Sequence, residues 1–487
     1  MSRLAGLLAL LALAVVGCGG TSGVGAGGAD IVPASAPAFI ALNTDVDSSQ
    51  WQAVDDLASR FPDKQKALKS FKEGISSEGI SWDNDLKPAL GPELDVVWLD
   101  FDNDGENFVA LMQPDDESKF EKVIAKAGED FVYEQVGEWQ VLASSQDLID
   151  RFRRESGSGD TLADKHAFQQ AMDSYPDDWL FRGYVDGTAL MDIARREADP
   201  DFRKIFPKLG RLDWFATNLR ATSDGIRWDA NVHGKPGPAF KGISPTKAFG
   251  PSLPHEVPKD ALAYATFHGA KGAFDRLEDN PIFTDVPEIH RYSALLRRIG
   301  LLLEGENAMY VRAAPSGKIP EITFIAEPAP GTNGMATLDR ILARYRSQLE
   351  LPSVPKPTRV AGVPARVFVG VPARGFLAEP VKVYYANVGR RLVVTDFPAG
   401  IKSLKGNPPA LAQSREYTGA LDDSGMPAKT QGFFYVNVRG GISYAELLAE
   451  TPIPGEIKRN LRPLRSAVEY AATRPSEIQV TFFLRIK

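Results

Sequence analysis

The clearest alternation of apolar and polar positions lies in residues 84–114, NDLKPALGPELDVVWLDFDNDGENFVALMQP. Two apolar runs, residues 94–101 and 108–112, flank an acidic turn that contains an Asp-Gly pair. Such a turn favours a β-hairpin, because Gly accepts the positive φ that tight hairpin turns require. Apolar residues then recur at helical spacing, at Phe120, Val123, Ile124 and Ala127. The pattern predicts two paired strands followed by an amphipathic helix.

The same order of elements returns in the second half of the chain. The segments LLLEGENAMYVRAA at 301–314 and PEITFIAEP at 320–328 have the pattern of a second hairpin. A run with helical spacing follows, with apolar residues at Leu338, Ile341, Leu342 and Tyr345. The chain is therefore predicted to contain a duplicated strand–turn–strand–helix unit.

The spacing between matched positions changes along the chain. It is 214 residues between Gly91 and Gly305, and 252 residues between Gly137 and Gly389. A repeat that keeps its order while its spacing changes is typical of a duplicated domain that has acquired insertions. The change places 38 extra residues in the second copy, around residues 347–380, where the alternating run 366–369 lies. We expect an additional hairpin or an excursion of the sheet edge there.

The predicted fold class is α+β. Strands follow strands too often for a βαβ series, so the sheets should be largely antiparallel, with helices packed on them. Two tandem copies of this unit are expected at residues 32–234 and 255–487. Residues 235–254, KPGPAFKGISPTKAFGPSLP, are rich in Pro and Gly and are predicted to link them.

The N-terminus has the pattern of a bacterial lipoprotein signal. Arg3 precedes an apolar run at residues 4–16, which is too short to span a bilayer, because a spanning helix needs roughly 20 residues. Small residues lead to Cys18, the only cysteine of the chain, as in a lipobox. Residues 1–17 are thus predicted to be a signal peptide, Cys18 a lipidation site, and 18–31 a Gly-rich spacer. The alternative is an ordinary secretory signal with a chance cysteine.

This signal places the mature protein on the extracytoplasmic face of the cell membrane, with the membrane as its partner through an acyl anchor at Cys18. Charge differs between the halves, with a net −17 for residues 1–234 and +10 for 235–487. Opposite charge suits either an interface between the halves or a second half that faces an anionic surface. An envelope component or another protein is a further expected partner, and no nucleic-acid partner is expected.

Several motifs of catalysis and cofactor binding are absent from the sequence. The five histidines have no HExxH spacing, and the sequence contains neither a GxSxG elbow nor a phosphate-binding GxxxxGK[ST] loop. A cysteine at the lipid anchor leaves no thiol nucleophile in the mature domain. No cofactor is expected on these grounds, apart from the calcium ion considered next.

Asp100, Asp102 and Asp104 with Gly105 form the DxDxDG opening of a calcium-binding loop. Alternate carboxylates followed by Gly allow a short loop to surround a hard cation with oxygen ligands. The twelfth position, where a bidentate Glu would complete such a loop, is Leu111. The segment therefore predicts either a weak calcium site or a solvated acidic turn.

The segment Asp85-Leu86-Lys87-Pro88-Ala89-Leu90-Gly91, followed by an apolar strand, resembles the family of domain of unknown function 3352. Ala89 stands where that family has an aromatic residue. The resemblance implies a secreted or lipid-anchored envelope protein, and it brings no catalytic residue.

The sequence thus favours a cell-envelope lipoprotein that binds a partner or has a structural role, and whether it is an enzyme stays open. The alternatives are an extracytoplasmic hydrolase without a recognisable motif, and a carrier of an apolar ligand between the two halves. A pocket with converging carboxylates or histidines would indicate the hydrolase, whereas an apolar groove would indicate the carrier.

Overall fold

A computed structural model describes residues 27–77, 79–127, 131–157, 159–238, 248–275, 280, 287–314, 319–351, 353–369, 381–449, 452–474 and 476–487. The predicted signal peptide, Cys18 and most of the spacer lie outside these ranges, as do residues 239–247 of the predicted linker. Within the described ranges, no helix is both long enough and apolar enough to cross a membrane.

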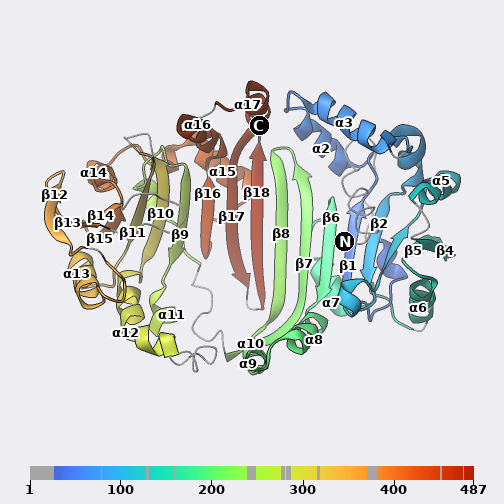
Figure 1. Cartoon of the computed structure of the whole chain (residues 1–487), viewed down its shortest axis with the longest axis horizontal. Helices are drawn as coiled ribbons and strands as arrows, with labels where there is room; N and C mark the ends of the chain where they lie inside the picture. Colours follow the sequence, from blue (N-terminus) through green and yellow to red (C-terminus); the bar gives the residue numbers. More distant parts are fainter. Residues whose placement is uncertain are drawn as a thin grey trace.

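The chain is α+β, as predicted, and its strands form one antiparallel sheet of 18 strands (Figure 1). The strands before the predicted linker are β1 (Ala38–Asn43), β2 (Glu93–Trp98), β3 (Phe108–Met112), β4 (Val132–Val136), β5 (Trp139–Ala143), β6 (Phe181–Asp186), β7 (Gly210–Thr222) and β8 (Gly225–Pro236). Those after it are β9 (Ala263–His268), β10 (Glu306–Ala313), β11 (Pro320–Ala326), β12 (Lys356–Val360), β13 (Val363–Val369), β14 (Lys382–Val388), β15 (Arg391–Thr395), β16 (Gly432–Val436), β17 (Leu464–Arg474) and β18 (Glu477–Ile486).

Helices connect these strands in both halves. The longer helices of the first half are α2 (Ser49–Ala58), α3 (Lys64–Ser77), α5 (Glu117–Ala127), α6 (Gln146–Ser156), α7 (His166–Met172) and α8 (Gly187–Glu197), with short turns α4 (Lys87–Ala89), α9 (Pro200–Arg203) and α10 (Phe206–Leu209). The second half has α11 (Lys271–Asp275), α12 (Pro287–Leu302), α13 (Gly334–Arg344), α14 (Pro398–Gly406), α15 (Arg415–Ser424), α16 (Val438–Leu448) and α17 (Gly455–Leu461).

The order of strands across the sheet is the same on both sides of its centre. Outward from β8 the order is β7, β6, β1, β2, β3, β5 and β4. Outward from β18, which pairs directly with β8, it is β17, β16, β9, β10, β11, β15 and β14, followed by β13 and β12. The extra pair β12–β13 lies within residues 347–380, where an additional hairpin was expected. The halves therefore share one sheet, and the superposition of the halves as two copies stays a prediction.

The predicted hairpin and helix of residues 84–127 are present. Strands β2 and β3 pair as expected, although β2 ends at Trp98, three residues earlier than predicted. Asn103, Asp104 and Gly105 all have positive φ, at 54°, 54° and 77°, so the reversal uses the left-handed region at three successive residues. Helix α5 follows and buries its apolar stripe.

Helices cover the two faces of the sheet differently. On one face, α6 and α7 pack on the first half, while α14 and α15 pack on the second. On the opposite face, α5 packs on Leu94 and Met112 of the outer strands, and α13 packs on Ala326 and Leu392. Figure 1 shows the helices around the periphery of the view, with none drawn across β17, β18, β8 and β7. We call the middle of this second face, formed by β8, β18, β17, β16, β9 and β10, the open face.

Candidate functional site

An apolar pocket lies where the two halves meet at one end of β8 and β18. Its volume is about 570 Å³. The pocket is lined by α2, α3, the turn between them and β8 from the first half, and by β18 and α17 from the second. The lining residues are Val54, Leu57, Ala58, Phe61, Asp63, Lys64, Ala67, Leu68, Phe71, Ile226, Asn460 and Ile486. We call this cavity the seam pocket. Its size lies within the range of about 300–1,000 Å³ that is usual for small-molecule sites.

The wall formed by α2 and α3 follows from local sequence signals. Ser48 caps α2 by accepting a hydrogen bond from the Trp51 N–H, at 3.5 Å. Ala67, Leu68 and Phe71 share one face of α3 at helical spacing and turn toward the pocket. Leu57 is buried with Ile486 in the core beneath the pocket, so this wall packs on strands from both halves.

The turn between α2 and α3 is tied to the centre of the sheet by Arg60. Its guanidinium donates to the Ser223 carbonyl at 2.7 Å and to the Ile486 carbonyl. Ser223 precedes β8 and Ile486 ends β18, so one arginine holds the turn against strands of both halves.

The polar residues of the pocket lining bond to neighbouring protein groups. The Asp63 N–H donates to the Asn460 side chain at 3.1 Å, and the Asn460 amide donates back to the Asp63 carboxylate. Lys64 donates to the Ser59 hydroxyl at 2.9 Å and pairs with Asp55. The interior therefore presents hydrocarbon, and its polar groups stand at the rim, where α3 and α17 bridge the halves.

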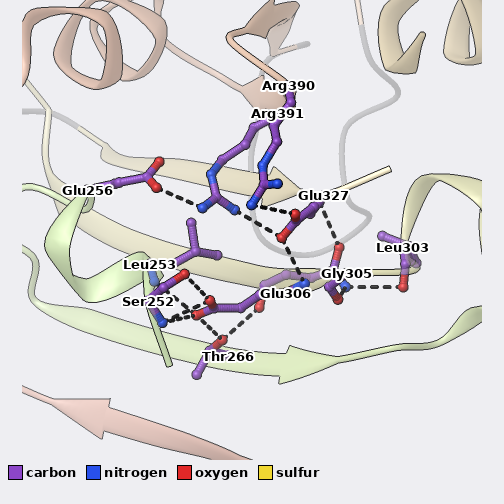
Figure 2. Close-up of polar contacts among 11 residues, drawn as sticks. Ser252, Leu253, Glu256, Thr266, Leu303, Gly305, Glu306, Glu327, Arg390 and Arg391 are labelled. Atoms are coloured by element: carbon purple, nitrogen blue, oxygen red, sulfur yellow. Dashed lines mark hydrogen bonds and ion pairs between the residues drawn. The ribbon is translucent and has the colours of Figure 1, made fainter. Parts of the chain in front are cut away.

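A second, polar cleft of about 760 Å³ lies at the ends of β10 and β11, beside the start of α13. Glu327 in its lining pairs with Arg390 at 2.8 Å and with Arg391 at 3.5 Å, and Arg391 also reaches Glu256 at 2.7 Å (Figure 2). Next to the cleft, the Glu306 carboxylate accepts hydrogen bonds from the N–H groups that begin the turn 252–255. These charges compensate one another and hold loops together, which is a structural role.

Glu93 has a similar role in the first half. Its carboxylate accepts a hydrogen bond of 3.4 Å from the Gly27 N–H, at the start of the turn Gly27–Asp30. Asp95, two residues on, is fully buried, and a Cβ added to Gly28 would lie 1.7 Å from its carboxylate oxygen. Burial raises the pKa of Glu93 to about 7. Burial and the neighbouring Glu93 carboxylate raise the pKa of Asp95 well above its usual value.

Sequence reasoning did not single out this carboxylate pair. The signal was available as Glu-x-Asp within the apolar run of residues 93–98. Period 2 in a strand places both side chains on one face, and the strand is buried on both faces.

The three aspartates of the expected calcium loop are held by different partners. Asp100 pairs with Arg151 and accepts a hydrogen bond from Asn107 at 2.8 Å. Asp102 pairs with Arg196 at 3.1 Å. Among the described residues, no group of three or more His, Cys, Asp or Glu side chains is placed to hold a metal ion. The calcium hypothesis for Asp100, Asp102 and Asp104 stays a prediction, and Cys18 lies outside the described residues.

No protein-family model matches the chain, and no curated protein does. Among solved structures, crystal form I of TP0453 aligns at 14% identity with a TM-score of 0.25, covering 49% of this chain and 80% of that one. Crystal form III of TP0453 aligns at 13% identity with a TM-score of 0.23, covering 47% and 78%. TM-scores this low do not establish a shared fold.

Proposed function

We propose that the protein is a lipid-anchored binding protein of the cell envelope that holds an apolar ligand in the seam pocket. The observation that carries this proposal is the apolar cavity between the halves. Removing hydrocarbon from water gives about 0.8 kcal/mol for each buried CH₂ group. A lining of Val, Leu, Ile, Phe and Ala side chains can supply this gain without any specific polar contact.

The contacts of the charged lining residues also favour binding over catalysis. General acid–base chemistry needs a titratable group directed at the reacting atoms. Asp63 and Lys64, the charged residues of the lining, are engaged by Asn460, Ser59 and Asp55 at the rim. A carrier requires only apolar area and a route to solvent, and the pocket provides the area.

The location rests on the N-terminal segment. Cys18 precedes the first described residue, Gly27, by nine positions, and a spacer of this length can reach at most ~30 Å. An acylated Cys18 would therefore hold the folded domain within a short distance of the membrane, where apolar ligands are available.

Binding can be measured with a fluorescently labelled C16 fatty acid. Ala58→Phe places a ring into the pocket and should weaken binding at least tenfold, because the probe and the ring compete for the same volume. Gln52→Phe adds the same ring at an exposed position of the same helix and should leave the affinity unchanged. Absence of binding to the wild type, or equal affinity for all three proteins, would refute the proposal.

A further inference from the structure

Large apolar side chains are exposed along the open face. Trp228 of β8, Ile478 of β18, Phe434 of β16, Phe267 of β9, Met309 of β10 and Ile322 of the adjoining strand β11 are each 37–45% accessible to solvent. Soluble proteins seldom expose contiguous apolar patches of more than a few hundred Å². Such a set on neighbouring strands therefore indicates a surface that binds something.

Strand register places these residues on the same side of the sheet. Directly paired residues of antiparallel strands point to the same face, and successive residues alternate. Trp228 pairs with Phe482, which shares its face with Ile478, and Phe482 in turn pairs with Glu469. Glu469 pairs with Phe434, so the exposed side chains of β8, β18 and β16 stand on one face.

The same relation continues through β9 and β10. Phe434 pairs with Ala265, and Ala265 pairs with Met309. Phe267 is two residues from Ala265 on the same strand, so it points the same way. The exposed apolar side chains thus lie on one face from β8 to β10 and on to β11, and only β17, between β18 and β16, contributes none of them.

This surface is nearly free of charge. Glu469 is the one charged residue that β8, β18, β17, β16, β9 and β10 direct to this side, and all residues of these six strands are described. The charged residues Arg227, Asp229 and Arg485 point to the opposite face, where α15 packs. A sugar or a polar peptide would find almost no hydrogen-bond partner here, whereas a hydrocarbon chain needs none.

Two other occupants conflict with the geometry. A peptide that adds as a strand requires a free sheet edge, and these strands are all paired on both sides. A second copy would carry its own α5 and α13 on the same face. Because a helix is about 10 Å thick, two such faces would stay about 20 Å apart, twice the ~10 Å at which sheets pack.

The open face is continuous with the seam pocket. Ile226 lines the pocket and lies on the same side of β8 as Trp228 and Val232. The six residue steps from Ile226 to Val232 span about 20 Å, longer than the ~15 Å of one leaflet of a bilayer's hydrocarbon core. A long acyl chain with its end in the pocket can therefore lie along the seam.

The open face is also wider than one chain. Five strand spacings separate β8 from β10, which is about 24 Å. Two acyl chains can lie side by side on this width, between the helices at either end.

We propose that the ligand is a membrane phospholipid whose two long acyl chains lie on the open face, with one chain entering the seam pocket. This proposal rests on the proposed function of the seam pocket and names its ligand class. The apolar residues of β8, β18, β16 and β9 shield the chains from below, and the polar headgroup stays in solvent.

The test uses the full chain carrying Cys18→Ser, incubated with vesicles of dioleoyl phosphatidylcholine and separated from them. Native mass spectrometry should show one bound phospholipid per chain. Ile478→Glu and Phe434→Glu place a charge on the open face and should lower phospholipid occupancy at least tenfold. Leu447→Glu changes a 76% exposed apolar residue of α16, which is not one of the strands that form the open face, and it should have no effect.

A second measurement does not depend on the folding of the variants. A phospholipid with a photoreactive diazirine at the end of one acyl chain should label peptides from β8, β18, β16 or β9 of the wild type. Labelling elsewhere, or wild-type occupancy in both open-face variants, would overturn the inference. Concentration-dependent dimers in sedimentation that are lost in Phe434→Glu would identify a second copy as the occupant and would also overturn it.

The labelled C16 fatty acid separates this inference from the proposed function. If the fatty acid binds and Ala58→Phe blocks it while no phospholipid binds, the pocket function stands and the phospholipid inference fails. If neither ligand binds the wild type, the proposed function itself fails.

Discussion

Thr481 and Asp229 are register partners at the middle of the β8–β18 pair, and the Thr481 hydroxyl donates a 2.6 Å hydrogen bond to the Asp229 carboxylate. The two positions are 252 residues apart, the same spacing that relates Gly137 to Gly389. If each residue of β8 and β18 is replaced by its equivalent 252 positions away in the other half, every register pair becomes another pair of the same ladder, and Thr481 and Asp229 exchange places. Such a self-complementary strand pairing is what a two-fold symmetric dimer would show, so it supports an origin of the chain by duplication.

Asp229 should be a major determinant of stability at this junction. It pairs with Arg227 at 2.7 Å, and both side chains are largely buried. Asp229→Ala leaves the buried arginine with neutral hydrogen-bond partners but no carboxylate. We expect a loss of about 3–5 kcal/mol in the free energy of unfolding, measured by urea titration.

The control for this experiment is Asp192→Ala. Asp192 pairs with Arg195 on the surface with 60% of its side chain exposed, so its loss should cost less than about 1 kcal/mol. Similar losses for the two variants would contradict the importance assigned to the β8–β18 junction.

The folded state should be less stable at high pH because of Glu93. The pKa of this group rises from 4.5 to about 7 on folding, so between these values the folded state binds more protons than the unfolded state. Its stabilising contribution is therefore complete at low pH and is lost as the pH rises toward and through 7. At about 1.4 kcal/mol per pKa unit, the change across this window is on the order of 3 kcal/mol.

The measurement is the free energy of unfolding of the wild type and of Glu93→Gln at pH 5 and pH 8. The variant lacks this titration, so its stability should fall less between the two pH values. Asp147→Asn alters an exposed carboxylate and should keep the wild-type dependence. A wild type that gains stability toward pH 8 would show that the pair is not protonated in the folded protein.

Calcium should have little effect on thermal stability. An ion at the acidic turn would have to displace Arg151 from Asp100 and Arg196 from Asp102. A site with the weak affinity of extracellular modules would instead raise stability by about 0.4–1.4 kcal/mol at ~1 mM calcium. Melting with calcium and with chelator, on the wild type and on the double variant Asp102→Asn/Asp104→Asn, decides between these outcomes. A rise in midpoint confined to the wild type with calcium would establish the metal site.

Membrane association should depend on Cys18. Cys18→Ser removes the thiol that the lipobox hypothesis acylates, and stable anchoring requires at least two acyl chains or an additional signal. The variant should appear in the soluble fraction after a high-salt wash of isolated membranes. Thr21→Ala, three residues further along the spacer, should stay with the membranes. Retention of Cys18→Ser would show that another part of the chain holds the protein there.

Local patterns in the sequence determined the elements that depend on near neighbours. The hairpin before α5 follows from an Asp-Gly turn between apolar runs, and α5 itself follows from apolar residues three and four apart. The hairpin β12–β13 was expected from the extra residues of the second half. These features involve residues close in sequence, so their physical causes can be read directly from it.

Tertiary structure decided the parts that we propose as ligand-binding sites. The seam pocket joins Val54 to Ile486 across nearly the whole chain, and it exists because the edges of β8 and β18 pair. The alternation in a strand predicts which side chains share a face, but only the packing of distant helices determines which face is covered. The spacing of Asp100, Asp102 and Asp104 fits a calcium loop, whereas the arginines that engage two of them come from α6 and α8. Contacts over such separations depend on how the whole sheet closes, and no local pattern contains that information.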